Sequence, residues 1–256
     1  MMIQTQAWLF DIALITDDIP RQWFNRLSDQ EKQRANSLKN TQRRHTYIAA
    51  HALAYRVLEN FYNAEISTLR IADEGPPIVT GDNSRSTMPT PCLGLSHSGN
   101  FILCSISAPN TLSGCDIETR KPRKNALAIA KQFFTEVEYH QLLQLADNNL
   151  HNEFENLFYQ CWTCKEAWLK AQGLGIANGL KKISIFQDAF RLSDTHALDW
   201  QLHTADNALY SISIAVQSTK NHPSADTVLL KEAIWDTSNF CTGKTLLSLR
   251  QLTAKT

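Results

Sequence analysis

The stretch from Phe154 to Gly175, F-E-N-L-F-Y-Q-C-W-T-C-K-E-A-W-L-K-A-Q-G-L-G, carries the clearest periodic pattern in this chain of 256 residues. Its large apolar side chains recur at intervals of three and four residues, the spacing of one face of an α-helix. Gly173 and Gly175 then end the pattern, as glycines often do at a helix C-terminus. The sequence therefore predicts a long helix that packs one face against a core.

Three polar or aromatic side chains share one face of this predicted helix. Trp162, Glu166 and Lys170 follow one another at intervals of four residues, which places them one above the other. Taken alone, the pattern equally fits an ordinary helix in which Glu166 and Lys170 form an ion pair. The helix pattern alone therefore does not indicate a function, and other segments have to be considered with it.

A second segment, S-G-C-D-I-E from Ser113 to Glu118, is predicted to be a short strand. Alternate side chains of a strand point to the same side, so Asp116 and Glu118 present two carboxylates together while Ile117 points into the core. Two carboxylates at one edge suit Mg²⁺, which prefers oxygen ligands. The alternative is a solvent-exposed strand face, on which the same two acidic residues would also be expected.

A third segment, L-S-H-S-G from Leu95 to Gly99, places His97 between two serine hydroxyls just before a predicted hairpin turn. Hydroxyl groups and an imidazole at such a turn can bind a phosphate. A single histidine is more often a structural residue, so this segment by itself does not indicate a phosphate-binding site.

The N-terminal part of the chain is locally basic. Eight Lys and Arg side chains stand against two acidic ones between Arg21 and Arg56. Ser28 with Glu31 predicts a capping box that opens one helix, and apolar periodicity predicts a second helix from about Arg44 to Tyr62. This basic helical segment is suited to hold an anion.

The composition of the whole chain excludes several classes of protein. The 25 basic and 25 acidic side chains cancel, which argues against nucleic acid or membrane attraction as the main function. The apolar stretch from Trp8 to Ile15 is interrupted by Asp11 and is expected to be a first strand. No apolar run approaches the roughly 20 residues of a membrane-spanning helix. We therefore expect a cytoplasmic protein.

Six cysteines are spread along the chain, and Cys161 and Cys164 form a C-x-x-C pair. A chain of this size folds without disulfides, so free thiols are expected. A redox pair or half of a zinc site is the alternative for Cys161 and Cys164, but no second such pair completes a zinc site.

Taken together, S-H-S-G, G-x-D-I-E and W-T-x-K-E-A-x-x-K, in this order, closely resemble the signature motifs of the Sfp-type 4′-phosphopantetheinyl transferases. The F-F-T-E-x-E stretch from Phe133 to Glu138 and the glycines after Lys170 extend the resemblance, so that it covers roughly residues 28–180. Thr135 and Glu138 in that stretch also form a predicted capping box.

The resemblance implies the fold. We expect an α+β protein of two pseudo-symmetric α/β halves with the active site at their junction. The N-terminal half, residues 1–112, would supply contacts to coenzyme A phosphates. The C-terminal half, residues 113–256, would carry the metal-binding carboxylates and the docking surface for a carrier protein.

The resemblance also implies the activity: transfer of the 4′-phosphopantetheine arm of coenzyme A to a serine of an apo acyl or peptidyl carrier protein, with release of 3′,5′-adenosine bisphosphate. Asp116, Glu118 and Glu166 would bind Mg²⁺, with Mn²⁺ as an alternative. Glu166 is also the expected general base, and Lys170 would neutralise or protonate the leaving phosphate.

Several residues are implied contacts of coenzyme A. His97 would bind its 3′-phosphate with Ser96 beside it, and Lys165 would contact a phosphate or support the fold. Further expected phosphate contacts come from the basic N-terminal segment: Lys32, Arg34, Arg43 and Arg44. We assign no such role to His51, where relatives carry an arginine.

The chain departs from the family pattern at Gly75, Pro76 and Pro77, where relatives have a basic residue between glycine and proline. A basic neighbour would have to compensate, or coenzyme A would bind more weakly. The basic segment Arg120–Lys124 is the expected docking site for an acidic carrier protein. We expect a monomer, because both halves of the site lie in one chain.

Three alternatives remain open at this point. A binding module would keep the coenzyme A pocket without turnover. A redox or zinc protein would use Cys161 and Cys164. A different metal-dependent enzyme would cleave a pyrophosphate without any carrier protein.

Overall fold

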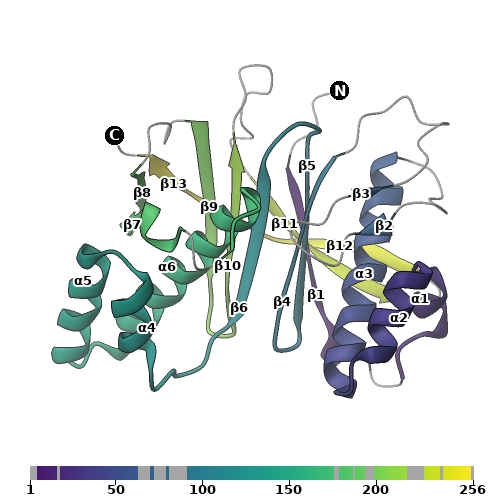
Figure 1. Ribbon diagram of the computed structural model, residues 1–256, viewed down its shortest axis with the longest axis horizontal. Helices are drawn as coiled ribbons and strands as arrows, with labels where there is room; N and C mark the ends of the chain where they lie inside the picture. Colours follow the sequence, from purple (N-terminus) through teal and green to yellow (C-terminus); the bar gives the residue numbers. More distant parts are fainter. Residues whose placement is uncertain are drawn as a thin grey trace.

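The computed structural model of the protein describes residues 5–15, 18–62, 70–71, 79–80, 91–175, 179–186, 188–193, 199–217, 228–236 and 239–254. Two β-sheets stand at the centre with helices outside each of them (Figure 1). Apolar side chains of both sheets, such as Leu9 and Leu103 from one and Ile117 and Ile212 from the other, form a shared core. The predicted α+β class with two sheet halves is therefore confirmed.

The first sheet has the strand order β12-β11-β1-β5-β4. Its strands are β1 (Gln6–Asp11), β4 (Cys92–Ser98), β5 (Phe101–Ser107), β11 (Leu229–Asp236) and β12 (Asn239–Ser248). The 3-10 helix η1 (Ile12–Leu14) follows β1, and β2 (Arg70–Ile71) pairs separately with β3 (Val79–Thr80).

Three helices cover the outer face of this sheet (Figure 1): α1 (Arg21–Arg26), α2 (Asp29–Ser37) and α3 (Thr41–Tyr62). The Ser28–Glu31 capping box that opens α2 is confirmed. Helix α3 begins earlier than periodicity predicted, because the side chain of Asn40 accepts a hydrogen bond from the backbone N–H of Arg43 (2.9 Å) and so caps the first turn.

The second sheet has the strand order β6-β10-β9-β13-β8-β7. Its strands are β6 (Ser113–Thr119), β7 (Ile183–Phe186), β8 (Ala189–Leu192), β9 (Trp200–Asp206), β10 (Tyr210–Gln217) and β13 (Arg250–Ala254). The helices α4 (Ala126–Phe133), α5 (Glu136–Asp147) and α6 (His151–Ala171) lie outside it, and the 3-10 helix η3 (Leu180–Lys182) leads into β7.

The C-terminal strands do not follow a simple division of the chain at residue 112. Strand β11 pairs in parallel with β1, for example Ala7 with Leu230, and β12 pairs with β11. The first sheet therefore contains residues from both ends of the chain. The division between residues 112 and 113 separates β5 from β6, but the strands of 229–248 return to the first sheet.

A buried ion pair ties α5 and α6 to the edge strand β7. Lys165 and Glu138 are both fully buried, and Lys165 Nζ lies 3.0 Å from Glu138 Oε2. The same Nζ donates to the carbonyl oxygens of Leu180 and Ile183, while Glu138 Oε1 accepts from the backbone N–H of Ile185. The network is satisfied on both sides, as buried charges require.

Replacing Lys165 with methionine should destabilise the protein by about 3 to 5 kcal/mol, because the charge of Glu138 is left buried without a cation beside it. Urea denaturation followed by circular dichroism measures this loss. Lys181→Met removes an exposed lysine nearby and should change the free energy of unfolding by less than about 0.5 kcal/mol. Equal effects of the two changes would contradict the structural role of Lys165.

His203 makes the stability of this sheet dependent on pH. Its side chain on β9 is fully buried, and burial lowers its pKa from 6.5 to about 4. The unfolded chain therefore binds a proton at this histidine before the folded chain does. As pH falls from about 6.5 to 4, folding should lose up to roughly 3 kcal/mol at this site. In His203→Phe the melting temperature should fall less steeply over this range than in the wild-type protein, and parallel slopes would contradict the assignment.

Candidate functional site

Strand β6 and helix α6 are held unusually close. A Cβ atom at Gly114 would lie 2.4 Å from both the carbonyl oxygen of Ala167 and the backbone nitrogen of Ala171. No side chain larger than hydrogen fits there. The glycine therefore allows α6 to lie directly on β6, with Glu166 and Lys170 beside the strand's carboxylates.

Asp116 is a buried carboxylate, and only 4% of it is exposed. Its Oδ1 accepts hydrogen bonds from Ser96 Oγ (2.9 Å) and Lys170 Nζ (2.6 Å). Within the described part of the chain, its buried Oδ2 has no hydrogen-bond partner. Burial raises the pKa of Asp116 although the charge of Lys170 opposes this.

Lys170 is the cation of this pair. Its Nζ also donates to Ser96 Oγ (3.0 Å). Burial disfavours its charge, but the attraction and hydrogen bond of Asp116, together with the charges of Cys115 and Glu166, outweigh burial, so the pKa of Lys170 is raised. Lys170 on α6 therefore lies beside Asp116 of β6. Ser96 lies between these two charges, rather than only beside His97.

Glu118 is surrounded by donors. Its Oε2 accepts from Ser98 Oγ (2.8 Å) and from the guanidinium of Arg123 (3.2 Å). Its Oε1 accepts from the indole N–H of Trp162 (3.2 Å). These three partners come from β4, from the link after β6 and from α6, so they fix the carboxylate at the place where the elements meet.

Glu166 is the third carboxylate, and it differs from the other two. Only 8% of it is exposed, and its buried Oε1 has no hydrogen-bond partner among the described residues. Burial, together with the charges of Asp116 and Glu118, raises its pKa to about 7, against the opposing effect of Lys170. The three carboxylates therefore lie near enough to repel one another.

The donor set fits a divalent cation in its chemistry. Carboxylate oxygens suit Mg²⁺, and Asp116 Oδ2 and Glu166 Oε1 are buried oxygens that lack partners in the described part of the chain. No group of three His, Cys, Asp or Glu side chains within that part is arranged ready to share one metal ion. Lys170 and Arg123 instead neutralise Asp116 and Glu118.

A positive edge lies next to these carboxylates. His97 is exposed at the end of β4, and its pKa is lowered by partial burial and by the cationic charges of Lys170, His51 and Arg43. Arg43 is exposed at the start of α3. Two of the predicted phosphate contacts, His97 and Arg43, are therefore within electrostatic reach of each other and of Lys170.

The other predicted basic contacts have local partners or lie outside this group. Arg44 donates to Asn36 Oδ1 (3.0 Å) and lies over the ring of Phe24. Lys32 is 3.9 Å from Asp29, and Arg34 is exposed on α2. Their contact with a phosphate stays a prediction. The Gly75–Pro77 departure lies outside the described residues.

His51 has a role that the sequence did not suggest. Its Nδ1 lies 2.6 Å from Oε1 of the buried Glu31, and its ring packs against that of Tyr47 with centroids 4.1 Å apart. His51 and Glu31 thereby join α2 to α3. Their spacing along the chain gives no local signal for this pair.

The predicted contact of Lys165 with a phosphate is corrected by its position. Its Nζ is fully buried and is occupied by Glu138 and two backbone carbonyls. An ammonium group has three protons to donate, so none remains for a ligand. Lys165 supports the fold.

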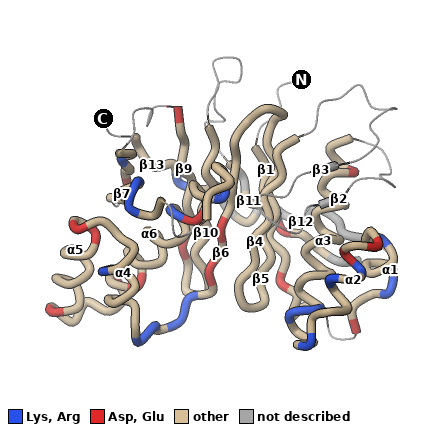
Figure 2. Tube along the Cα trace, viewed as in Figure 1, with Lys and Arg blue, Asp and Glu red and all other residues tan. Residues whose placement is uncertain are grey.

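The basic segment Arg120–Lys124 divides into inward and outward side chains. The Arg120 side chain is only 10% exposed and lies near Glu155; it donates to the carbonyl oxygen of Asn207. Arg123 binds Glu118. Lys121 and Lys124 are exposed. Figure 2 shows this basic link after β6, with further Lys and Arg over α2 and the start of α3.

The C-x-x-C pair does not form a redox or zinc site. Cys161 and Cys164 are both fully buried free thiols. Burial raises the pKa of Cys164 to about 12 and that of Cys161 well above its ordinary value. A reactive thiol needs a lowered pKa and access to solvent, so both cysteines act as small apolar side chains. The Cys241 side chain lies outside the described residues.

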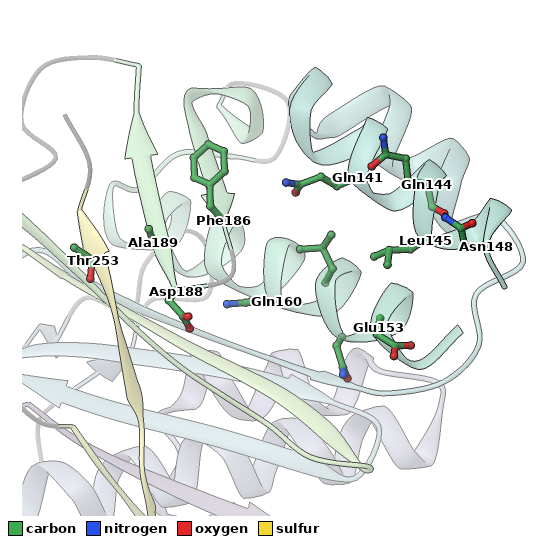
Figure 3. A pocket seen from close by; sticks show the side chains of 12 residues that line it. Gln141, Gln144, Leu145, Asn148, Glu153, Gln160, Phe186, Asp188, Ala189 and Thr253 are labelled. Carbon is green, nitrogen blue, oxygen red and sulfur yellow. The ribbon is translucent and has the colours of Figure 1, made fainter. Parts of the chain in front are cut away.

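A pocket of about 880 Å³ lies between α5, the first half of α6 and strands β7 and β8 (Figure 3). Amide side chains such as Gln141, Gln144 and Gln160 line it together with Leu157 and Phe186. Its lining contains no Lys or Arg and none of the predicted site residues. It does not suit a phosphate ligand, so the candidate site is the one at β4, β6 and α6.

Arg123 and Trp162 are site residues to which the sequence gave no partner. Trp162 lies on the same helical face as Glu166, four residues before it, and this spacing is a usable signal. No comparable signal exists for Arg123, because its approach to Glu118 depends on how the link after β6 folds back.

No helix in the described part of the chain has the length and apolar character needed to span a membrane.

Comparison with known proteins finds similarity over segments that include β6 and α6. The family model described as the 4′-phosphopantetheinyl transferase superfamily matches residues 113–218, which include β6 and α6. The 4′-phosphopantetheinyl transferase HetI of Nostoc sp. is 32% identical over 161 residues, 62% of this chain and 64% of HetI. The 4′-phosphopantetheinyl transferase Sfp of Bacillus subtilis is 26% identical over 178 residues, 67% of this chain and 73% of Sfp.

The similarity to HetI thus spans a little less than two thirds of that protein. The matched superfamily model and these relatives confirm the Sfp-type resemblance. Over residues 113–218 the chain is thus similar to the 4′-phosphopantetheinyl transferase superfamily.

Proposed function

We propose that this protein transfers the 4′-phosphopantetheine arm of coenzyme A to a serine hydroxyl of an apo acyl or peptidyl carrier protein. The observation that carries the proposal is the packing of α6 on β6, which sets Glu166 and Lys170 beside Asp116 and next to the positive edge at His97. Phosphoryl transfer to a hydroxyl needs a bound phosphate, neutralised charge and a base, and this site offers a residue for each.

Coenzyme A would bind through its phosphates. His97 takes the 3′-phosphate, and Arg43 contributes a second positive charge from the start of α3. Lys32, Arg34 and Arg44 remain proposed contacts from the same basic segment. The lowered pKa of His97 would rise again beside a phosphate, because an anion favours the charged imidazole.

Asp116, Glu118 and Glu166 would hold Mg²⁺, or Mn²⁺, at the pyrophosphate. When bound, the cation neutralises phosphate charge and acts as a Lewis acid. The two buried oxygens without partners in the described chain, Asp116 Oδ2 and Glu166 Oε1, support this assignment.

The protein's own acid and base are Lys170 and Glu166. Glu166 accepts the proton of the carrier serine as the serine oxygen bonds to phosphorus. The bond from that phosphorus to the bridging oxygen of the pyrophosphate breaks, and Lys170 stabilises or protonates the departing phosphate of 3′,5′-adenosine bisphosphate.

The acidic carrier protein would dock on the exposed lysines of the link after β6, Lys121 and Lys124. Arg120 and Arg123 belong to the same basic segment, but both have partners inside the protein. The expectations of a monomer and of a cytoplasmic location stay predictions.

Incubation with Mg²⁺, coenzyme A and an apo carrier protein should add a phosphopantetheine arm to the carrier, which mass spectrometry detects. Glu166→Gln should reduce the rate by at least about a hundredfold, because the base and one carboxylate ligand are lost together. Glu153→Gln makes the same change at an exposed position of the same helix and should leave the rate unchanged. Absence of an adduct on every carrier tried would defeat the proposed function.

Charge reversal on the outward lysines should weaken docking without affecting coenzyme A. Lys121→Glu and Lys124→Glu should each raise the KM for an acidic carrier about three- to tenfold at low salt, with little change at high salt where such charges are screened. Lys181→Glu reverses one exposed charge on η3 and serves as the control. Equal KM values for all three variants would place docking elsewhere.

A further inference from the structure

Arg123 is bound on two sides. Its guanidinium lies over three aromatic rings of α6, with distances to the ring centroids of 5.9 Å for Phe158, 5.4 Å for Tyr159 and 6.0 Å for Trp162. Its Nε also donates to the hydroxyl of Tyr159 (3.3 Å). These three rings, Phe158, Tyr159 and Trp162, form an aromatic shelf that holds the guanidinium in place.

The opposite partner of Arg123 is Glu118. The distance from the guanidinium to Glu118 Oε2 is 3.2 Å, and the two side chains are only 23% and 20% exposed. Trp162 belongs to both groups, because its ring lies in the shelf and its N–H donates to Glu118 Oε1. The shelf therefore sets the position of Arg123, and Arg123 and Trp162 together set that of Glu118.

Asp116 and Glu118 are thus matched by internal cations. Lys170 pairs with Asp116 at 2.6 Å, as Arg123 pairs with Glu118. In this arrangement, no three acidic side chains in the described chain are ready to share one metal ion. A divalent cation that binds Glu118 has to compete with the charge that Arg123 already supplies.

We propose that Arg123 is a positioning residue. In the absence of metal it is the internal counter-ion of Glu118, and it releases this carboxylate when a divalent cation binds there. The proposal rests on the proposed function, since it takes Glu118 as a metal ligand. In the absence of metal, the pair keeps a largely buried carboxylate neutralised, which spares the protein the cost of an unpaired charge.

The same shelf connects Glu118 to the docking segment. The hydroxyl of Tyr159 donates to the backbone carbonyl of Lys121 (2.7 Å) and accepts from its backbone N–H (3.1 Å). The link that carries Lys121 and Lys124 is therefore fastened to the residues that hold Arg123. Exchange of Arg123 for a metal ion at Glu118 releases a positive charge within this link, where an acidic carrier would bind.

The test measures binding of Mn²⁺ alone to the whole protein by electron paramagnetic resonance, without coenzyme A or carrier. Arg123→Gln removes the competing charge and should raise the affinity for Mn²⁺ about three- to tenfold, since partly exposed ion pairs have modest strength. In a Glu118→Gln background the same change should have no effect, because the coupling runs through Glu118. Lys131→Gln, which removes an exposed lysine on α4, should leave the affinity unchanged.

A purely structural role would predict the opposite, because loosening of the site lowers or preserves metal affinity. Equal affinities of Arg123→Gln and the wild-type protein, including no binding by either, would overturn the proposal. So would an equal rise in the Glu118→Gln background, which indicates a general charge effect. If Arg123→Gln does not fold, Arg123→Lys is measured instead. Lysine keeps the positive charge but lacks the planar group that packs on the shelf, so the affinity for Mn²⁺ should rise about two- to threefold. An unchanged affinity for Mn²⁺ would contradict the proposal.

These outcomes are separate from those of the transfer reaction. Wild-type protein that modifies a carrier while Arg123→Gln binds Mn²⁺ no better would leave the proposed function intact and remove the inference about Arg123. Failure of every carrier to be modified would remove the proposed function, whatever the Mn²⁺ affinities are.

Discussion

The close contact between α6 and β6 is the constraint on which the site depends. A side chain at residue 114 would collide with the backbone of Ala167 and Ala171, so only glycine allows the helix to lie on the strand. This contact brings Lys170 within 2.6 Å of Asp116. It also buries Asp116 and Glu166, and burial in turn raises the pKa values of these two carboxyl groups.

The second consequence is a balance of charge across the junction of the two sheets. Strand β4 belongs to the first sheet and β6 to the second, yet Ser96 and Ser98 of β4 donate to Asp116 and Glu118. The partners of the two carboxylates therefore come from both sheets, and the site lies at the boundary between them.

Local signals predicted the fold elements well, and the non-local contacts escaped them. The capping boxes at Ser28 and Thr135 are set by neighbours three residues away, so the sequence reveals them. The return of β11 to β1 pairs residues more than 220 positions apart, and nothing in the pattern of either strand specifies that partner. Of the two roles expected for Lys165, support of the fold holds because adjacent residues on a helix point about 100° apart: Glu166 faces β6, whereas Lys165 binds Glu138.

The environment of α6 also gives Glu166 and Lys170 different protonation behaviour. Glu166 and Lys170 lie one turn apart, but Lys170 is paired with Asp116, which keeps it charged. No such cation pairs with Glu166 in the described chain, where its Oε1 is unsatisfied and its pKa rises to about 7. At one pH the site therefore offers a carboxylate that can take up a proton and an ammonium group that stays charged. Because Asp116 holds Lys170 and helps to raise the pKa of Glu166, one carboxylate acts on both groups, and a change at Asp116 would disturb both together.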